Sequence, residues 1–154
     1  ELAFVQSYVR IQQVRYDGKL EIIYDIEEAI TEYLIPKLVL QPLVENAVYH
    51  GIEGQENGGV IWVSALKFDH ELLISVRDNG KGMTQTKIDE LNESISKQPS
   101  NEALRCHAGD SLGLNNIAQR LRLMYGEGGS LSIDGSPGQG LVVTISIQLL
   151  PKGD

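Results

Sequence analysis

Two segments of the sequence alternate apolar and polar residues on both sides of a tight turn, and this pattern strongly limits the possible folds. Residues 58–80, GGVIWVSALKFDHELLISVRDNG, predict two strands joined at Asp69 and His70. Residues 129–151, GSLSIDGSPGQGLVVTISIQLLP, predict a second hairpin around a Ser-Pro-Gly turn. Residues 19–26, KLEIIYDI, add one more strand. The chain is therefore expected to build a sheet whose apolar side needs a cover.

Helical spacing of apolar residues between these strands supplies that cover. The sequence predicts helices over residues 2–16, 41–51, 84–95 and 112–125. Helices that alternate with strand pairs indicate an α+β fold, a two-layer sandwich in which helices cover one face of a mixed, largely antiparallel sheet. No linker or repeat interrupts the 154 residues, so we expect a single domain over residues 1–154.

The overall composition excludes several classes of protein. No apolar run approaches the ~20 residues of a membrane-spanning helix. The net charge of −8 opposes contact with a phosphate backbone, so no nucleic acid is expected as a partner. The single cysteine, Cys106, cannot form an internal disulfide, which favours a reducing compartment.

The segment LQPLVENAVYHGI, residues 40–52, combines the pattern of a buried helix with polar residues that a core does not need. Its apolar stripe consists of Leu40, Leu43, Val44, Ala47 and Val48. Asn46 and His50 are four residues apart, so on a helix they form a column along the edge of this stripe. Two interpretations are open: the pair satisfies hydrogen bonds at the margin of a core, or it lines a binding site.

Two glycine-containing segments could complete such a site. In DNGKGM, residues 78–83, an acid ends a predicted strand and two glycines precede a helical pattern, so a ligand could approach the backbone closely. In SLGLNNI, residues 111–117, Gly113 precedes a predicted helix whose first N–H groups favour phosphate. Each segment alone could be structural, but the order and spacing of all three segments favour a site.

At these residues the chain resembles a known family, the ATP-binding domain of sensor histidine kinases, within the superfamily of DNA gyrase B, the heat-shock chaperone ATPase and the mismatch-repair ATPases. LVENAVYHG resembles the N-box of that family, DNGKGM its first glycine box, LGLNNI the second, and GQGLVVTISI the closing strand. Residues 35–52, IPKLVLQPLVENAVYHGI, are similar to the membrane-bound branch of these kinases, which has an LQPLVENA-type N-box. The resemblance implies a Bergerat-type two-layer α/β sandwich.

The resemblance also implies the chemistry of individual residues. Asn46 would offer its amide oxygen to Mg²⁺, and His50 would lie near the phosphates of ATP. Asp78 would accept a hydrogen bond from the amino group of adenine, where guanine has a carbonyl. The other nucleotide-binding residues implied by the family pattern are Gly80, Gly82, Met83, Ser111, Gly113, Leu114 and Thr144.

Several of these expectations concern the backbone or a position in the sheet. Gly80 and Gly82 are expected to let the base and sugar pack against the backbone. Gly113 and Leu114 are expected to present N–H groups to the phosphates when a lid closes, and Thr144 to lie near the adenine.

Three positions depart from the family pattern. Ser111 stands where the second glycine box usually begins with glycine, and Tyr49 replaces a lysine common in the N-box. Pro42 occupies the position where hydrolytic relatives have the acid that activates water. Glu45, beside Asn46, is therefore a candidate catalytic residue with an open role: it could hold a metal-bound water, polarise an accepting histidine, or simply be solvated.

The resemblance implies a catalytic domain that transfers the γ-phosphoryl group of ATP to a histidine on a separate segment. Residues 1–16 would lead in from an absent dimerisation and phosphoacceptor segment, and residues 84–112 would contain the ATP lid. Further partners would be a response regulator and, in the full-length protein, a second subunit of a homodimer. The domain would be the cytoplasmic part of a membrane-anchored bacterial sensor kinase. The alternatives are an ATP-hydrolysing or serine-phosphorylating relative, and a non-catalytic nucleotide-sensing or dimerisation module.

Overall fold

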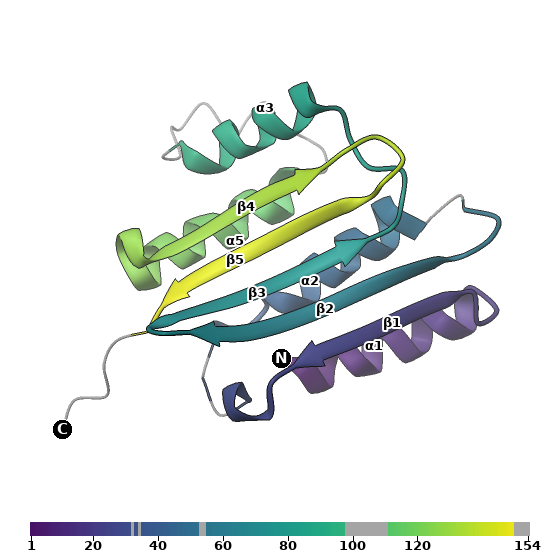
Figure 1. Cartoon of the computed structure of the whole chain (residues 1–154), viewed down its shortest axis with the longest axis horizontal. Coiled ribbons are helices and arrows are strands. Elements are labelled where there is room, and N and C mark those ends of the chain that lie inside the picture. Colours follow the sequence, from purple (N-terminus) through teal and green to yellow (C-terminus); the bar gives the residue numbers. More distant parts are fainter. Residues whose placement is uncertain (32, 34, 53–54, 98–110, 150–154) are drawn as a thin grey trace.

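A single five-stranded sheet forms the centre of the computed structural model, which describes residues 1–31, 33, 35–52, 55–97 and 111–149 (Figure 1). The strands are β1 (Leu20–Ile26), β2 (Gly59–Phe68), β3 (Glu71–Asp78), β4 (Gly129–Gly135) and β5 (Leu141–Gln148). Their order is β1-β2-β3-β5-β4, in which β1 and β2 are parallel and the other neighbours are antiparallel. The predicted mixed, largely antiparallel sheet is confirmed.

The longer helices accompany this sheet as a second layer. They are α1 (Leu2–Arg15), α2 (Leu40–Asn46), α3 (Gln85–Ser96) and α5 (Ser111–Tyr125). The chain continues from α2 into one π-helical segment, η2 (Ala47–Ile52), and short 3₁₀ turns lie at η1 (Glu28–Ile30) and η3 (Gly126–Gly128). Figure 1 shows α1, α2 and α5 side by side behind the sheet, with α3 beside the edge strand β4. The predicted cover on one face is confirmed.

The core lies between the two layers because alternate strand residues point toward the helices. On the central strands these residues include Ile61, Val63, Ile74, Val76 and Ile145, all buried. The helices contribute apolar residues at three- and four-residue spacing, such as Leu40, Leu43, Val44 and Ala47 of α2 and its continuation. Burying each large side chain stabilises the fold by roughly 1.5–3 kcal/mol, so this interface holds the two layers together.

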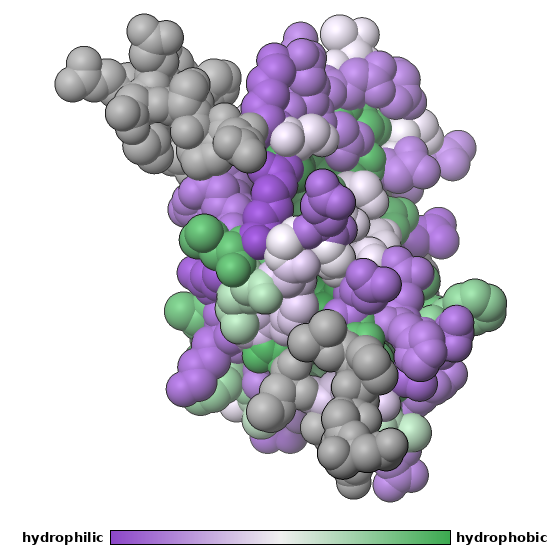
Figure 2. All heavy atoms as spheres, turned by 90° about the vertical axis from the view of Figure 1, so that its left-hand side faces the viewer, coloured by the Kyte–Doolittle hydropathy of each residue, from purple (hydrophilic) through white to green (hydrophobic). Residues whose placement is uncertain are grey.

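The other face of the sheet carries pairs of side chains across neighbouring strands. The guanidinium of Arg77 lies 5.2 Å from the centroid of the Trp62 ring, and the hydroxyls of Ser64 and Ser75 are 2.6 Å apart. Figure 2 shows one end of the molecule, where hydrophobic residues appear as separate spots among hydrophilic ones outside the grey segments.

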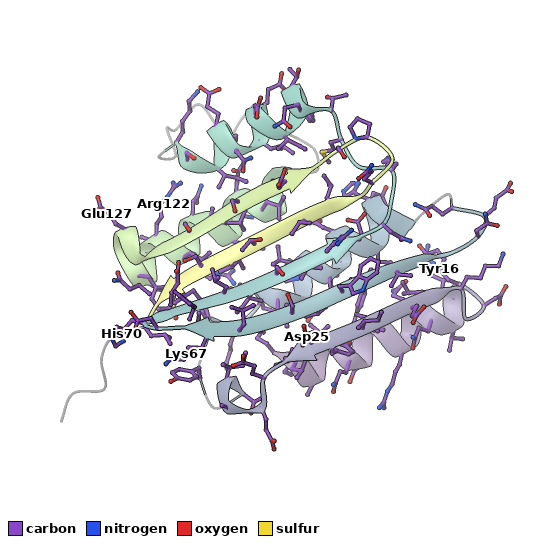
Figure 3. All side chains as sticks on the ribbon, viewed as in Figure 1. Tyr16, Asp25, Lys67, His70, Arg122 and Glu127 are labelled. Atoms are coloured by element: carbon purple, nitrogen blue, oxygen red, sulfur yellow. The ribbon has the colours of Figure 1, made fainter. Side chains whose placement is uncertain are left out.

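Side chains from the helices fix α3 and α5 relative to the strand edge. The side-chain amide of Asn92 donates to the carbonyl of Ile133 at 2.8 Å and accepts from its N–H at 2.9 Å, so it takes the place of a neighbouring strand at the β4 edge. Arg122 of α5, labelled in Figure 3, donates to the carbonyls of Ile95 and Lys97 at the end of α3. The position of α3 therefore follows from β4 and α5 together.

Two predicted boundaries differ from the structure. The helix expected over residues 41–51 is α-helical only to Asn46 and then widens into the π-helical segment, a feature that local apolar spacing does not reveal. Gly113, expected just before the helix start that favours phosphate, lies within the first turn of α5, whose bounds agree with the helix predicted over residues 112–125 to one residue. The region predicted as an ATP lid, residues 84–112, contains the regular helix α3, and its residues 98–110 lie outside the described residues. Within the described ranges, every helix is too short or too polar to cross a membrane.

Candidate functional site

A pocket lies between the sheet and the helical layer, next to the C-terminal end of β3. Its lining comes from seven elements and one loop: Leu43, Asn46, Ala47, His50, Val76, Asp78, Met83, Leu91, Leu114, Ile133, Leu141 and Val143. The N-box column, the acid of the first glycine box and the second glycine box are thus brought together around one space, although they are far apart in the sequence. If Asn46 and His50 only satisfied hydrogen bonds at the margin of the core, this convergence would have no explanation.

Asp78 is the charged group among the described residues of the pocket lining, and it is 4% exposed. Its carboxylate accepts the N–H of Gly80 at 2.8 Å and also a backbone hydrogen bond from Leu141 at the start of β5. Burial raises the pKa of Asp78, while these two donors and the nearby His50 and Arg77 act in the opposite direction. A carboxylate offers about four acceptor positions, so Asp78 can accept a further hydrogen bond from a ligand.

The glycines around Asp78 are required by contacts within the protein. A Cβ on Gly140 would lie 1.9 Å from the backbone oxygen of Asp78, and a Cβ on Gly82 would lie 1.9 Å from that of Ser136. Both glycines also have positive φ, +78° and +62°. The loop after β3 therefore packs directly on the β4–β5 turn. The close approach of the base and sugar expected at Gly82 stays a prediction.

Asn46 and His50 reach the pocket from the helical layer, as the four-residue column predicts. A Cβ on Gly113 would lie 4.0 Å from the side-chain nitrogen of Asn46, so the N-box and the first turn of α5 are neighbours. Among the described residues, none forms a hydrogen bond with the half-buried Asn46 amide. The His50 ring packs edge-on against Tyr49 with centroids 4.8 Å apart. The Asn46 amide is therefore available to a ligand or a metal ion.

Glu45 and Thr144 are not brought into this pocket. The Glu45 carboxylate accepts from the Gln41 side chain at 2.8 Å and interacts with Tyr8 of α1, on another side of α2. Thr144 lies on β5 between the buried residues Val143 and Ile145, so its side chain points to the opposite face of the sheet. The expectation that Thr144 lies near the adenine does not agree with this register.

Met83 and Leu114 line the pocket, and Gly80, buried beside it, holds Asp78 through its N–H group. Ser111 is the first residue of α5. The apolar walls were not identified from the sequence: Leu91, Ile133, Leu141 and Val143 belong to elements predicted correctly, but only their packing turns them toward one space. For Leu141 and Val143, the alternation of β5 carries the signal, because Ile145 and Ile147 share their face.

The cavity volume of the pocket is about 30 Å³, and because about 10–15 Å³ in this measure holds one water molecule, the space takes only a few waters. A purine base is larger than a water molecule, so its entry requires side chains of the lining to move. Met83 is half-buried and has an unbranched, flexible side chain, which makes it the residue most easily displaced.

Comparison with known proteins identifies the family. Residues 32–151 match the family of histidine kinase-, DNA gyrase B- and HSP90-like ATPases. The chain belongs to this family. The YwpD protein of Bacillus subtilis is 38% identical over 151 residues, which cover 97% of this chain and 49% of that protein. The sensor histidine kinase YpdA of Escherichia coli is 38% identical over 128 residues, which cover 83% of this chain and 20% of that kinase. The chain spans about half the length of the first relative and a fifth of the second.

Solved structures of members of this family share the fold. The catalytic domain of the histidine kinase ThkA has a TM-score of 0.62 at 17% identity, covering 96% of this chain and 91% of that one. The histidine kinase domain of a blue-light-activated kinase from Erythrobacter litoralis has a TM-score of 0.60 at 19% identity, covering 96% of this chain and 60% of that one. At this identity the likeness concerns the fold alone, and it confirms the expected Bergerat-type sandwich.

Proposed function

We propose that this domain binds Mg²⁺-ATP and transfers the γ-phosphoryl group to a histidine on a separate segment of a sensor histidine kinase. The observation that carries the proposal is the convergence of Asp78, Asn46, His50 and Leu114 on one pocket of a family of ATPases. Phosphoryl transfer asks a protein mainly for positioning and charge neutralisation. A pocket lined by an acid, an amide and a helix start suits that requirement.

Asp78 would recognise the adenine. As an ionised carboxylate it accepts hydrogen bonds and cannot donate one, so it pairs with the adenine amino group but would face the carbonyl of guanine as acceptor against acceptor. Its two backbone donors, Gly80 and Leu141, hold the carboxylate in a fixed orientation. The apolar walls formed by Val76, Leu141 and neighbouring residues would cover the faces of the base.

Asn46 would hold Mg²⁺ through its amide oxygen. The half-buried amide, which has no hydrogen-bond partner among the described residues, fits this role, because Mg²⁺ prefers oxygen ligands, keeps several waters and uses few protein groups. When bound, the ion would neutralise charge on the phosphates. Gly113, beside Asn46, lies in the first turn of α5, whose unpaired N–H groups favour phosphate. We assign the phosphate-proximal role to His50 and leave Glu45 without one, since Glu45 lies outside the pocket lining.

The phosphoacceptor would be a histidine segment of the same kinase, followed by a response regulator, with the full-length protein a homodimer on the cytoplasmic side of a membrane. Support comes from relatives such as YpdA, which is named a sensor histidine kinase. Pro42 at the position of the hydrolytic acid favours transfer over hydrolysis.

Competition between ATP and GTP tests the adenine pocket. In Asp78→Asn the carboxylate becomes an amide of similar shape, and loss of a hydrogen bond to a charged group should weaken ATP binding about ten- to a hundredfold and reduce the preference for ATP. The matched control is Asp25→Asn, which removes an exposed acid on β1 (Figure 3). Equal effects of both variants, or an unchanged ATP preference in Asp78→Asn, would contradict the assignment.

A melting curve accompanies this experiment. Because burial raises the pKa of Asp78, its ionisation costs folding free energy as the pH rises through the folded-state pKa, and the Asn variant lacks that cost. We therefore expect Asp78→Asn to remain folded at neutral pH, so that weaker ATP binding reports on the pocket.

Transfer itself is tested by mixing the domain, ATP and Mg²⁺ with a histidine-containing upstream segment from a full-length relative. Acid-labile, base-stable phosphohistidine on that segment is the expected product. Phosphate release without the acceptor segment would indicate a hydrolase, and binding without either product would indicate a nucleotide-sensing module.

A further inference from the structure

Helix α1 is apolar on two opposite sides. Val5 and Val9 are buried against the core, whereas Phe4, Ile11 and Val14 are 70%, 68% and 80% exposed. At 3.6 residues per turn, the exposed residues fall on a narrow stripe on the side of the helix away from the buried valines. One apolar side is enough to attach a helix to a core, so the exposed stripe needs another explanation.

The exposed stripe has the spacing of a coiled-coil seam. Phe4, Ser7, Ile11 and Val14 follow the three-four spacing of heptad positions a and d. The hydroxyl of Ser7 donates to the carbonyl of Ala3 in the same helix at 3.0 Å, so its hydrogen-bonding capacity is used within α1. Figure 1 shows α1 at the end of the helical layer, next to α2 and behind β1, where its outer side faces away from the sheet. A second helix could therefore lie along α1.

The charges beside the stripe determine which helix fits. Arg10 and Arg15 occupy the flanking g and e positions, both are exposed, and α1 contains no acidic residue. Two copies of α1 would place arginine against arginine in a parallel and in an antiparallel pair, which is unfavourable. A partner with acidic e and g positions would instead form ion pairs with both arginines.

A membrane surface fits the stripe less well than a helix. Interfacial helices have a wide apolar face and a basic polar face, whereas this stripe is narrow and the opposite side of α1 is already buried in the core. The net charge of −8 also opposes approach to anionic lipids.

We propose that the outer stripe of α1 binds an amphipathic helix with acidic flanking residues, and does not pair with a second α1. Since α1 is already folded against the core, no ordering of α1 opposes this binding. The proposal does not depend on nucleotide binding.

Two synthetic helical peptides of three heptads test the proposal, with leucine at a and d and either glutamate or lysine at e and g. Like charges at e and g keep each peptide from pairing with itself. We expect the glutamate peptide to bind the domain about tenfold or more tightly than the lysine peptide in calorimetry, because two ion pairs replace two repulsions. The double variant Arg10→Glu/Arg15→Glu should reverse this preference, and Ile11→Asp should abolish binding of both peptides.

The control variant is Leu123→Asp, which removes an 88% exposed apolar residue of α5 and should leave peptide binding unchanged. Because all the substituted side chains are exposed, melting curves should stay close to the wild type. Equal binding of both peptides, no binding of either, or an equal loss in Leu123→Asp would overturn the proposal. So would a wild-type dimer in sedimentation that Ile11→Asp dissociates, or binding to vesicles of anionic phospholipid that the arginine variant abolishes.

Discussion

Replacing Gly140 by alanine should displace Asp78, the acid of the pocket, because Gly140 packs against the backbone of Asp78. Gly138 provides an internal control. Gly140 and Gly138 lie in the same turn with nearly the same positive φ, +78° and +77°. A Cβ on Gly138 meets nothing within 4 Å, whereas a Cβ on Gly140 would lie 1.9 Å from the backbone oxygen of Asp78. The two variants share the backbone strain and differ only in the clash.

The expected costs follow from these contacts. A left-handed conformation costs a residue with a Cβ about 1–2 kcal/mol, and both variants pay it. In Gly140→Ala the start of β5 must also move away from Asp78, which removes the hydrogen bond from Leu141 to the buried carboxylate. Loss of a hydrogen bond to a charged group adds about 1.5–3 kcal/mol. The free energy of unfolding should therefore fall by about 2.5–5 kcal/mol in Gly140→Ala and by about 1–2 kcal/mol in Gly138→Ala.

Thermal and urea unfolding measure this difference. For a domain of this size, 1 kcal/mol lowers the melting temperature by roughly 2–4 °C, so we expect decreases of roughly 5–20 °C in Gly140→Ala and 2–8 °C in Gly138→Ala. ATP affinity, measured by calorimetry where both variants are folded, should fall in Gly140→Ala alone. Equal losses of stability in the two variants would refute the inference that the contact between Gly140 and Asp78 stabilises the fold. Unchanged ATP affinity in Gly140→Ala would mean that the turn before β5 does not support the ATP site.

Three further predictions concern other parts of the molecule. Asn46→Ala should abolish the Mg²⁺ dependence of ATP binding without unfolding the domain, while Gln6→Ala, an exposed amide on α1, should leave it unchanged in the same titration. Burial opposes ionisation of Glu1, but the hydrogen bonds from the N–H groups of residues 38–40 outweigh burial and lower the pKa of Glu1. The ionised carboxylate therefore stabilises the fold at neutral pH, and this stabilisation is lost as the pH falls through the folded-state pKa. Glu1→Gln should therefore lower the free energy of unfolding by about 1 kcal/mol at pH 7. In urea unfolding at decreasing pH, the difference in free energy of unfolding between the variant and the wild type should become smaller. Asn92→Ala removes two hydrogen bonds to the β4 edge and should lower the free energy of unfolding by about 1–2 kcal/mol in urea; an unchanged midpoint would mean that water replaces the amide.

Local patterns in the sequence determined the elements and the polar residues of the site. Alternation of period two located the strands, helical spacing located the helices, and the four-residue interval between Asn46 and His50 placed both side chains on the pocket side of one helix. The same patterns placed an acid, Asp78, at the end of a predicted strand, and Asp78 is the last residue of β3. These properties depend on residues a few positions apart, where the geometry of a helix or strand is sufficient to relate them.

Tertiary packing decided the features that depend on distant residues. The parallel pairing of β1 with β2 could not be predicted, because a strand's own pattern does not specify its neighbour. The Glu1 carboxylate accepts hydrogen bonds from backbone 37 to 39 residues away, and Gly140 is required by the backbone of Asp78 on another strand. The position of Thr144 was inferred from the family pattern, but the register of β5 turns it to the opposite face. Each outcome depends on which surfaces meet when the sheet and the helices pack, and local spacing carries no information about that choice.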